Sequence, residues 1–252
     1  MSIDSKYLNM FRKSVEMGAI GASKFIGKND KIAADQSAVN FMRKELNKIE
    51  MRGKIVIGEG EMDEAPMLYI GEELGSGNGQ NLDIAVDPLE CTNFVAKNLP
   101  NSFSVLAVTE KGNMFSAPDT YMEKIAIGKN LPSKLVDLDF SVKKNIQNLA
   151  DAKQTEPSKL IACVLKRPRH DKIIEELEKM KVKIRFISDG DVSGAVSVAD
   201  DNSPIDIYMG IGGAPEGVLS AAALCCLGGQ IQTRLVLETN QIDRAKKMGV
   251  ED

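Results

Sequence analysis

Residues 82–94 read LDIAVDPLECTNF, a strand-like run followed at once by polar residues. The first five residues are mostly apolar and β-prone, which predicts a strand. Pro88 has no N–H to donate, so we expect the strand to stop there and to leave Asp87 at its C-terminal end. Ligands of α/β sheets bind outside such strand ends, and Glu90 and Thr92 follow closely enough to face the same crevice.

This acidic turn has two possible interpretations. Two carboxylates close together repel each other unless a cation lies between them, and such hard oxygen ligands favour Mg²⁺ or Mn²⁺ over zinc. Thr92 would add a hydroxyl that can hold or polarise a water molecule. Alternatively, Asp-Pro is a common turn and Glu90 is a solvated surface side chain. The stretch by itself leaves both interpretations open.

Two further acidic segments strengthen the metal interpretation. The strand-like IVIGEGEMDEAP carries Glu59, Glu61, Asp63 and Glu64 in a glycine-rich turn. NDKIAADQSAVN supplies Lys31 and Asp35 near the start of an expected helix. An acid early in a helix is also favoured simply by the helix dipole. Three acidic clusters beside strand or helix ends suit a multi-metal phosphoryl-transfer site better than chance solvation.

Composition narrows the class of protein. The chain has 252 residues, enough for one large domain or two modest ones, and its 43% hydrophobic and 27% charged residues are typical of a soluble globular protein. With 32 basic and 36 acidic residues, the charge balance indicates neither nucleic acid nor a membrane as partner. The N-terminus lacks the apolar core of a secretion signal, and the four cysteines lack metal or disulfide spacing, so we expect a cytoplasmic protein.

The order of expected elements predicts an α/β protein with two different halves. The first half should contain helices at 4–27 and 34–49, then strands at 54–58, 82–86, 103–109 and 124–128. A hairpin turn at 110–113, between SVLAVT and MFSA, would make that sheet partly antiparallel. The second half alternates strands at 160–165, 183–188, 205–211 and 230–236 with helices at about 170–181, 191–199 and 215–227, which is typical of a mainly parallel sheet. Loop composition at 129–140 suggests a boundary, giving an α+β domain over 1–135 and an α/β domain over 136–252.

Seven segments, in order, resemble one known family. They are DKIAADQSAVN, IVIGEGEMDEAPMLYIGEELG, AVDPLECTNF, APDTYMEKI, KRPRHD, DGDVSGAV and GIGGAPEGVLSAA. Together they closely resemble the class II (GlpX-type) fructose-1,6-bisphosphatases of the lithium-sensitive, inositol-monophosphatase-like superfamily. The resemblance implies a layered α-β-α-β-α sugar phosphatase fold with a metal-binding first domain and a substrate-binding second domain. The family's chains continue beyond the final RAKKMGVED, so we expect either a C-terminally truncated second domain or a natural short form.

The resemblance also implies roles for individual residues. Ligands for Mn²⁺ or Mg²⁺ are implied at Asp35, Glu59, Asp87, Glu90 and Glu216. Catalytic roles are implied for Thr92, Asp63 and Lys31, with Thr92 helping to activate the attacking water. Substrate contacts are implied at Glu90, Cys91, Thr92, Tyr121, Arg167, Pro168, Arg169, Asp189, Gly190, Asp191 and Gly213. Guanidinium groups bind phosphate oxygens in pairs, so Arg167 and Arg169 suit the non-reacting phosphate. We interpret His170, the only histidine, as structural.

The implied activity is metal-dependent hydrolysis of the 1-phosphate of fructose 1,6-bisphosphate, giving fructose 6-phosphate and phosphate in gluconeogenesis or Calvin-type sugar metabolism. Sedoheptulose 1,7-bisphosphate is a possible second substrate, and a homo-oligomer, dimer or tetramer, is expected from the family. Cys91 stands where the family has glycine, and a side chain there would be strained if the backbone needs a positive φ. The alternatives are a phosphatase for another small ester, such as inositol phosphate, and a weakened paralogue that binds sugar phosphate without turnover.

Overall fold

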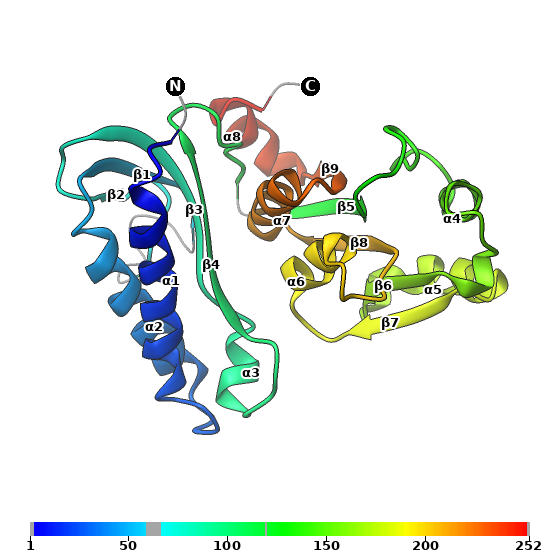
Figure 1. Ribbon diagram of the computed structural model, residues 1–252, viewed down its shortest axis with the longest axis horizontal. Coiled ribbons are helices and arrows are strands. Elements are labelled where there is room, and N and C mark those ends of the chain that lie inside the picture. The colour runs from blue at the N-terminus through cyan, green and yellow to red at the C-terminus, as the bar shows by residue number, and fades with distance from the viewer. Residues whose placement is uncertain (1–2, 59–66, 119, 251–252) are drawn as a thin grey trace. The chain divides into compact units, whose positions relative to one another are not determined.

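The computed structural model describes residues 3–58, 67–118 and 120–250 (Figure 1). It divides into two compact units: unit 1 comprises residues 1–117 and 245–252, and unit 2 comprises residues 118–244. Each unit has its own sheet and its own apolar core. The expected α/β class is confirmed, with helices packed on two mixed sheets. No helix within the described ranges has the length and hydropathy that a membrane span needs.

In unit 1, two long helices pack on a four-stranded sheet with the order β2-β1-β3-β4. The helices and strands are α1 (Tyr7–Ser23), α2 (Lys31–Leu46), β1 (Met51–Ile57), β2 (Glu73–Leu74), β3 (Gln80–Glu90), α3 (Thr92–Ala96) and β4 (Phe103–Glu110). β3 is parallel to β1 and antiparallel to β4. Both expected long helices and the first three expected strands are therefore confirmed.

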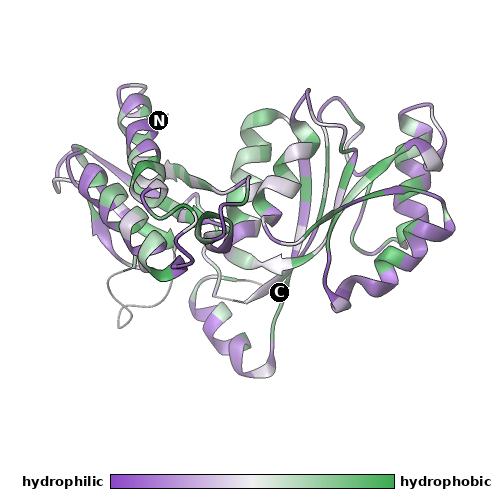
Figure 2. Ribbon diagram, turned by 90° about the horizontal axis from the view of Figure 1, so that it is seen from below, coloured by the Kyte–Doolittle hydropathy of each residue, from purple (hydrophilic) through white to green (hydrophobic). Residues whose placement is uncertain are grey.

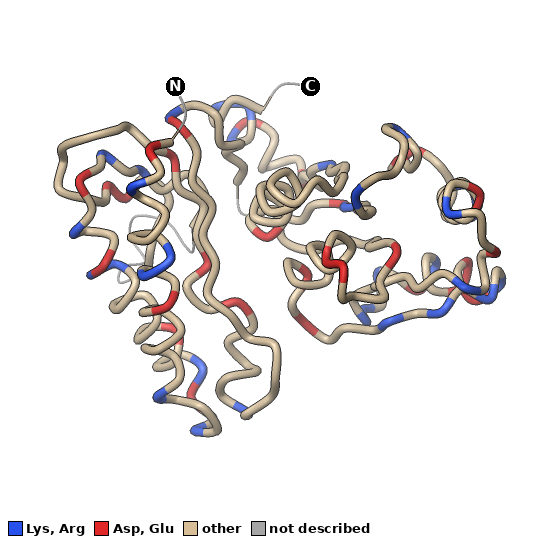
Figure 3. The backbone as a smooth tube through the Cα atoms, in the orientation of Figure 1, with Lys and Arg blue, Asp and Glu red and all other residues tan. Residues whose placement is uncertain are grey.

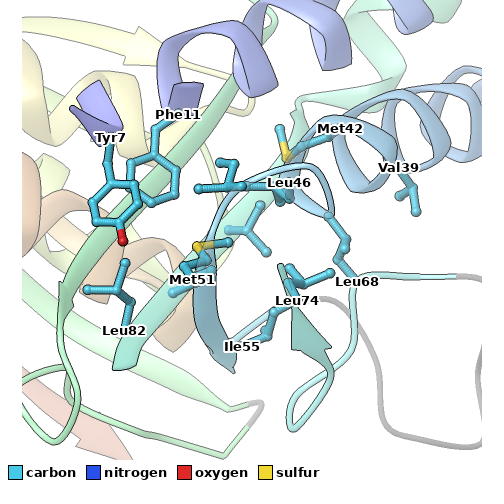
Figure 4. Close-up of a cluster of buried hydrophobic side chains, with 13 residues drawn as sticks. Tyr7, Phe11, Val39, Met42, Leu46, Met51, Ile55, Leu68, Leu74 and Leu82 are labelled. Carbon is cyan, nitrogen blue, oxygen red and sulfur yellow. The ribbon is translucent and has the colours of Figure 1, made fainter. Parts of the chain in front are cut away.

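The core of unit 1 lies between the sheet and the two helices. Met51 and Ile55 of β1 alternate with exposed residues, so every second side chain of the strand points to the helices. Figure 4 shows Met42 and Leu46 of α2 and Phe11 of α1 in this core. The hydroxyl of buried Tyr7 donates to the backbone oxygen of Glu50 at 2.7 Å, which satisfies the one polar atom of that side chain.

In unit 2, the sheet has five strands in the order β7-β6-β8-β5-β9. The main elements are β5 (Tyr121–Ile127), α4 (Val142–Ala152), β6 (Ile161–Leu165), η3 (Pro168–His170), α5 (Asp171–Lys179), β7 (Lys183–Ile187), α6 (Asp191–Val196), β8 (Ile207–Gly213), α7 (Ala214–Leu227) and β9 (Gln230–Val236). The last helix, α8 (Ile242–Lys247), begins in unit 2 and ends in unit 1. Ile125 and Ile127 face a cluster with α4 and α5, whereas Ala126 and Tyr208 face a cluster with α6 and α7. Apolar residues, green in Figure 2, therefore cover both faces of this sheet.

The structure corrects three details of the expected layout. The segment 124–128 lies in β5, which pairs with β8 and β9 of unit 2 rather than with the first sheet. Both of those pairings are antiparallel, so the second sheet is mixed, with only the β6 pairings parallel. The helix α4, which begins after the N-cap Ser141, was not expected from the sequence.

The expected hairpin at 110–113 is also wrong. Residues 114–117 form no strand, and the antiparallel partner of β4 is β3. The N–H of Gly112 donates to Oδ2 of Asp83 at 2.6 Å. This bond ties the turn back to β3, so the chain leaves the sheet instead of folding back along β4.

Candidate active site

β3 does not stop at Pro88, contrary to the expectation from the sequence. It continues to Glu90, which pairs with Phe103 of β4, and the register shifts between Asp87 and Glu90. Pro88 is accommodated at this β-bulge, where a missing N–H breaks no regular ladder. Its carbonyl oxygen accepts a hydrogen bond from the hydroxyl of Ser104 at 2.6 Å. Asp87 and Glu90 therefore both belong to β3 and do not lie in a loop after it.

The bulge explains the three-residue spacing of the two acids. In a regular strand, side chains three positions apart point to opposite faces. Val86 and Leu89, however, both belong to the apolar clusters that include α2 residues. The extra residue of the bulge therefore resets the alternation, so that Asp87 and Glu90 both lie on one face of the strand. Both carboxylates are buried, and Oδ1 of Asp87 accepts the N–H of Leu89 at 2.9 Å.

Cys91 has a left-handed backbone, with φ 64° and ψ 53°. This is the conformation that glycine adopts without steric cost, so a cysteine at this position is strained. The strained residue turns the chain from β3 directly into α3, whose first residue is Thr92. Thr92 therefore follows the two acids of β3 closely along the chain, and its side chain is half-buried.

Asp35 is brought to this end of the sheet by packing of α2. Its neighbour Ala34, together with Ala38, packs against Leu89 and Val95. Oδ1 of Asp35 is buried and has no hydrogen-bond partner among the described residues, and burial raises the pKa of this carboxyl to about 6. A buried carboxylate oxygen that lacks a donor is suited to a cation.

Other predicted residues of unit 1 give less information. Lys31 is the exposed first residue of α2. β1 ends at Ile57, which pairs with Ala85 two positions before Asp87. Glu59 and Asp63 themselves lie outside the described residues.

Within residues 3–58, 67–118 and 120–250, no three His, Cys, Asp or Glu side chains are grouped closely enough to hold a metal ion. Figure 3 shows acidic positions on the part of β3 that leads into α3.

In unit 2, four of the predicted residues meet around the end of β8. Tyr121 pairs with Gly213 across the antiparallel β5–β8 ladder. The guanidinium carbon of Arg169 lies 4.9 Å from the centre of the Tyr121 ring, and its Nε donates to the carbonyl of Ile211 at 3.0 Å. Glu216, in the first turn of α7, approaches Gly213 so closely that a Cβ atom there would lie 2.0 Å from Oε2. A side chain at position 213 would therefore displace the carboxylate of Glu216.

Asp191 also lies at the end of β8, next to Gly212, and it has a partner that the sequence interpretation missed. Its Oδ2 lies 2.5 Å from Nζ of Lys124, a buried residue of β5. The signal was available, since Lys124 lies between Met122 and Ala126 on the inward-facing positions of a strand. Gly190 is the buried residue just before α6, and Asp189 is half-buried with Oδ1 accepting the N–H of Gly190 at 3.1 Å.

The residues of the basic loop lie in different surroundings. Arg167 is half-buried and donates only to the neighbouring carbonyl of Lys166 among the hydrogen bonds of the described residues, while Pro168 is exposed at the start of η3. Arg169 is the member of the loop that joins the cluster at the end of β8. His170 is fully buried: Nδ1 lies 2.7 Å from the Leu165 carbonyl, and Nε2 accepts the N–H of Ile211 at 2.7 Å. Its bonds are structural, as expected.

Comparison with known proteins adds a family match over most of the chain. Residues 6–252 match the family described as bacterial fructose-1,6-bisphosphatase, glpX-encoded. A protein of Synechocystis is 47% identical over 89% of this chain and 68% of its own length, and one of Crocosphaera subtropica is 43% identical over 94% and 76%. A Nostoc protein is 44% identical, also over 94% and 76%. All three are named D-fructose 1,6-bisphosphatase class 2/sedoheptulose 1,7-bisphosphatase.

Proposed function

The chain belongs to the glpX-encoded bacterial fructose-1,6-bisphosphatase family, and we propose that it hydrolyses the 1-phosphate of fructose 1,6-bisphosphate to fructose 6-phosphate and orthophosphate. The observation that carries this proposal is the family match over residues 6–252, which includes every residue proposed for the site. The names of the relatives support sedoheptulose 1,7-bisphosphate as a second substrate. An inositol phosphate phosphatase and an inactive sugar-phosphate-binding paralogue are not favoured.

We propose Mn²⁺ or Mg²⁺ as the cofactor. In unit 1 the proposed ligands are Asp35, Glu59, Asp87 and Glu90, and in unit 2 the proposed ligand is Glu216. The buried, donor-free oxygen of Asp35 and the two acids that the bulge turns to one face of β3 fit a hard divalent cation. Such an ion, when bound, neutralises phosphoryl oxygens and makes water a stronger nucleophile.

The residues of the chain have distinct proposed tasks. Thr92, at the first position of α3, orients the attacking water, and Lys31 and Asp63 assist turnover. Arg169 holds the non-reacting phosphate, because its guanidinium is already fixed by the Ile211 carbonyl and the Tyr121 ring, so little side-chain freedom is lost on binding. Further substrate contacts are proposed for Glu90, Cys91, Arg167, Pro168, Asp189, Gly190, Asp191 and Gly213.

The remaining proposals concern the state of the protein in the cell. We propose a cytoplasmic homo-oligomer, a dimer or a tetramer. Unit 1 supports self-association because large apolar side chains of its helical layer are exposed, among them Leu8 at 72%, Ile20 at 49% and Ile32 at 76%.

The activity is tested by orthophosphate release from fructose 1,6-bisphosphate with Mn²⁺ or Mg²⁺, with and without a chelator. We expect metal-dependent release, and a loss of about 100-fold or more in kcat/KM for Asp87→Asn, because a ligand on the reacting face is removed. Asp83→Asn is the matched control: it changes a buried acid four positions earlier in the same strand, one that bonds to Gly112. Metal-independent release, or an equal loss in both variants, would contradict the proposal.

A further inference from the structure

A buried ion pair lies beneath the end of β8 in unit 2. Lys124 is 1% exposed, and its Nζ is 2.5 Å from Oδ2 of Asp191. The side chains of the pair are 0% and 8% exposed, respectively, so the lysine is sealed inside the unit while the carboxylate keeps a small opening. The lysine is therefore placed to act on Asp191 and not on a ligand directly.

The end of β8 is shaped around this pair. A Cβ atom at position 212 would lie 1.8 Å from Oδ2 of Asp191 and 3.0 Å from Nζ of Lys124. Because Gly212 has no side chain, the carboxylate of Asp191 can occupy this space beside β8. The residues on either side, Ile211 and Gly213, are those that contact Arg169 and Glu216. The ion pair therefore lies against the same backbone segment, 211–213, as Arg169, the proposed phosphate-binding residue, and Glu216, the proposed metal ligand.

Stability alone does not account for a buried pair of this kind. The free energy needed to remove two charges from water is about as large as the gain from their attraction. Replacing such a pair with well-packed apolar residues often gives an equally stable protein. A second polar group is buried beside it: the hydroxyl of Tyr208 has no hydrogen-bond partner among the described residues, and the charges of Asp191 and Glu216 act on it. The described residues therefore leave one polar atom of this cluster without a hydrogen bond, as expected of a site arranged for a ligand.

We propose that Lys124 is a positioning residue: its ammonium holds Oδ2 of Asp191 so that the second carboxylate oxygen can accept a hydroxyl group of the sugar phosphate. This inference rests on the proposed function. Without the ammonium, a carboxylate at the start of the short helix α6 would be free to rotate and would lose its fixed direction. Lys124 itself contacts no substrate.

The test is a double-mutant cycle on the full chain with its metal. The variants are Lys124→Met, Asp191→Asn and the double variant, in which no charge of the pair remains buried. The matched control is Lys153→Met, which breaks the Lys153–Asp206 ion pair elsewhere in unit 2, where the side chains are 39% and 13% exposed. The KM and kcat for fructose 1,6-bisphosphate, the Kd for fructose 6-phosphate by calorimetry, and the melting temperature are measured for each protein.

We expect Lys124→Met to raise KM and the product Kd about tenfold, with a smaller effect on kcat. In the Asp191→Asn background, the same substitution should change KM and the product Kd less than about twofold. Lys153→Met should leave both constants unchanged. Unchanged constants in folded Lys124→Met, or equal effects in both backgrounds, would overturn the inference. If the wild-type chain releases no phosphate, the proposed function fails, and the calorimetric cycle still tests whether Lys124 acts through Asp191.

Discussion

At Cys91 the chain combines a left-handed backbone with a side chain that this conformation disfavours. The residue is 6% exposed, so neither the backbone nor the thiol can relax easily into solvent. The strain lies between Glu90 and Thr92, where small displacements would alter both the carboxylate and the hydroxyl. We therefore expect stability and turnover to be linked at Cys91.

We expect Cys91→Gly to be more stable than Cys91→Ala by about 1 kcal/mol, because both variants lack the thiol and only glycine lacks the strained Cβ. Urea unfolding of the two variants measures this difference. Phosphate release by the same proteins tests whether the strain limits activity, in which case turnover rises in the glycine variant alone. Equal stability of the two variants would show that the backbone at position 91 relaxes when the thiol is removed.

At the scale of elements, the bulge in β3 and the short η3 segment do the positioning in their respective units. The bulge turns two acids to one face of the sheet. In unit 2, His170 links η3 to β8, because its ring donates to the Leu165 carbonyl and accepts the Ile211 N–H. The neutral imidazole with the proton on Nδ1 satisfies both bonds, whereas the charged ring has no lone pair for Ile211. This link holds Arg169 beside the end of β8.

We expect acid to weaken this link. Burial is the largest cause that lowers the pKa of His170 from its ordinary value of 6.5. The unfolded chain therefore binds the proton more readily, so the stabilisation by neutral His170 is complete above pH 6.5 and declines as the pH falls below that value. Urea unfolding at pH 7.5 and 5.5 should show a larger loss of stability for the wild type than for His170→Asn. An identical pH dependence in both proteins would mean that this ring does not titrate differently on folding.

At the scale of the whole molecule, stability is expected to depend on the metal. The carboxyl of Asp35 has a raised pKa in the metal-free fold, about 6 against 3.8, because burial disfavours its charge. A folded state that binds the proton more tightly than the unfolded state loses stability as the pH rises through this range. A divalent cation would reverse this loss by binding the ionised form.

In the presence of a chelator, we expect the wild type to lose about 1–2 kcal/mol between pH 4 and pH 8 through this carboxyl, after allowance for its partial exposure, and Asp35→Asn to lack that loss. Adding Mn²⁺ at about 100 times its Kd should stabilise the wild type by about 2.7 kcal/mol and the variant much less. Denaturant unfolding with and without metal measures both effects. Equal stabilisation of the two proteins by Mn²⁺ would exclude Asp35 as a ligand.

Much of the local structure could be predicted from the sequence alone. The pattern of apolar residues identified both long helices of unit 1 and the strands of both sheets except the two-residue β2, because these elements bury one face or both. The seven motifs identified the family that the comparison confirms, and the chemistry of Asp35, Asp87 and Glu90 pointed to a hard cation. The left-handed backbone at Cys91 agrees with the glycine that the family pattern has there.

Strand pairing and side-chain partners were decided only by the tertiary structure. The strand at Tyr121–Ile127 pairs with β8 and β9, which lie far along the chain, and no local pattern specifies such a partner. The continuation of β3 through Pro88 depends on the bulge against β4 and on the Ser104 hydroxyl, which donates to the Pro88 carbonyl. Lys124 could be recognised as inward-facing, but its partner Asp191 is 67 positions away. A sequence determines which side chains must be buried, whereas the packed chain determines which of them meet, because long-range contacts depend on the joint path of all the elements.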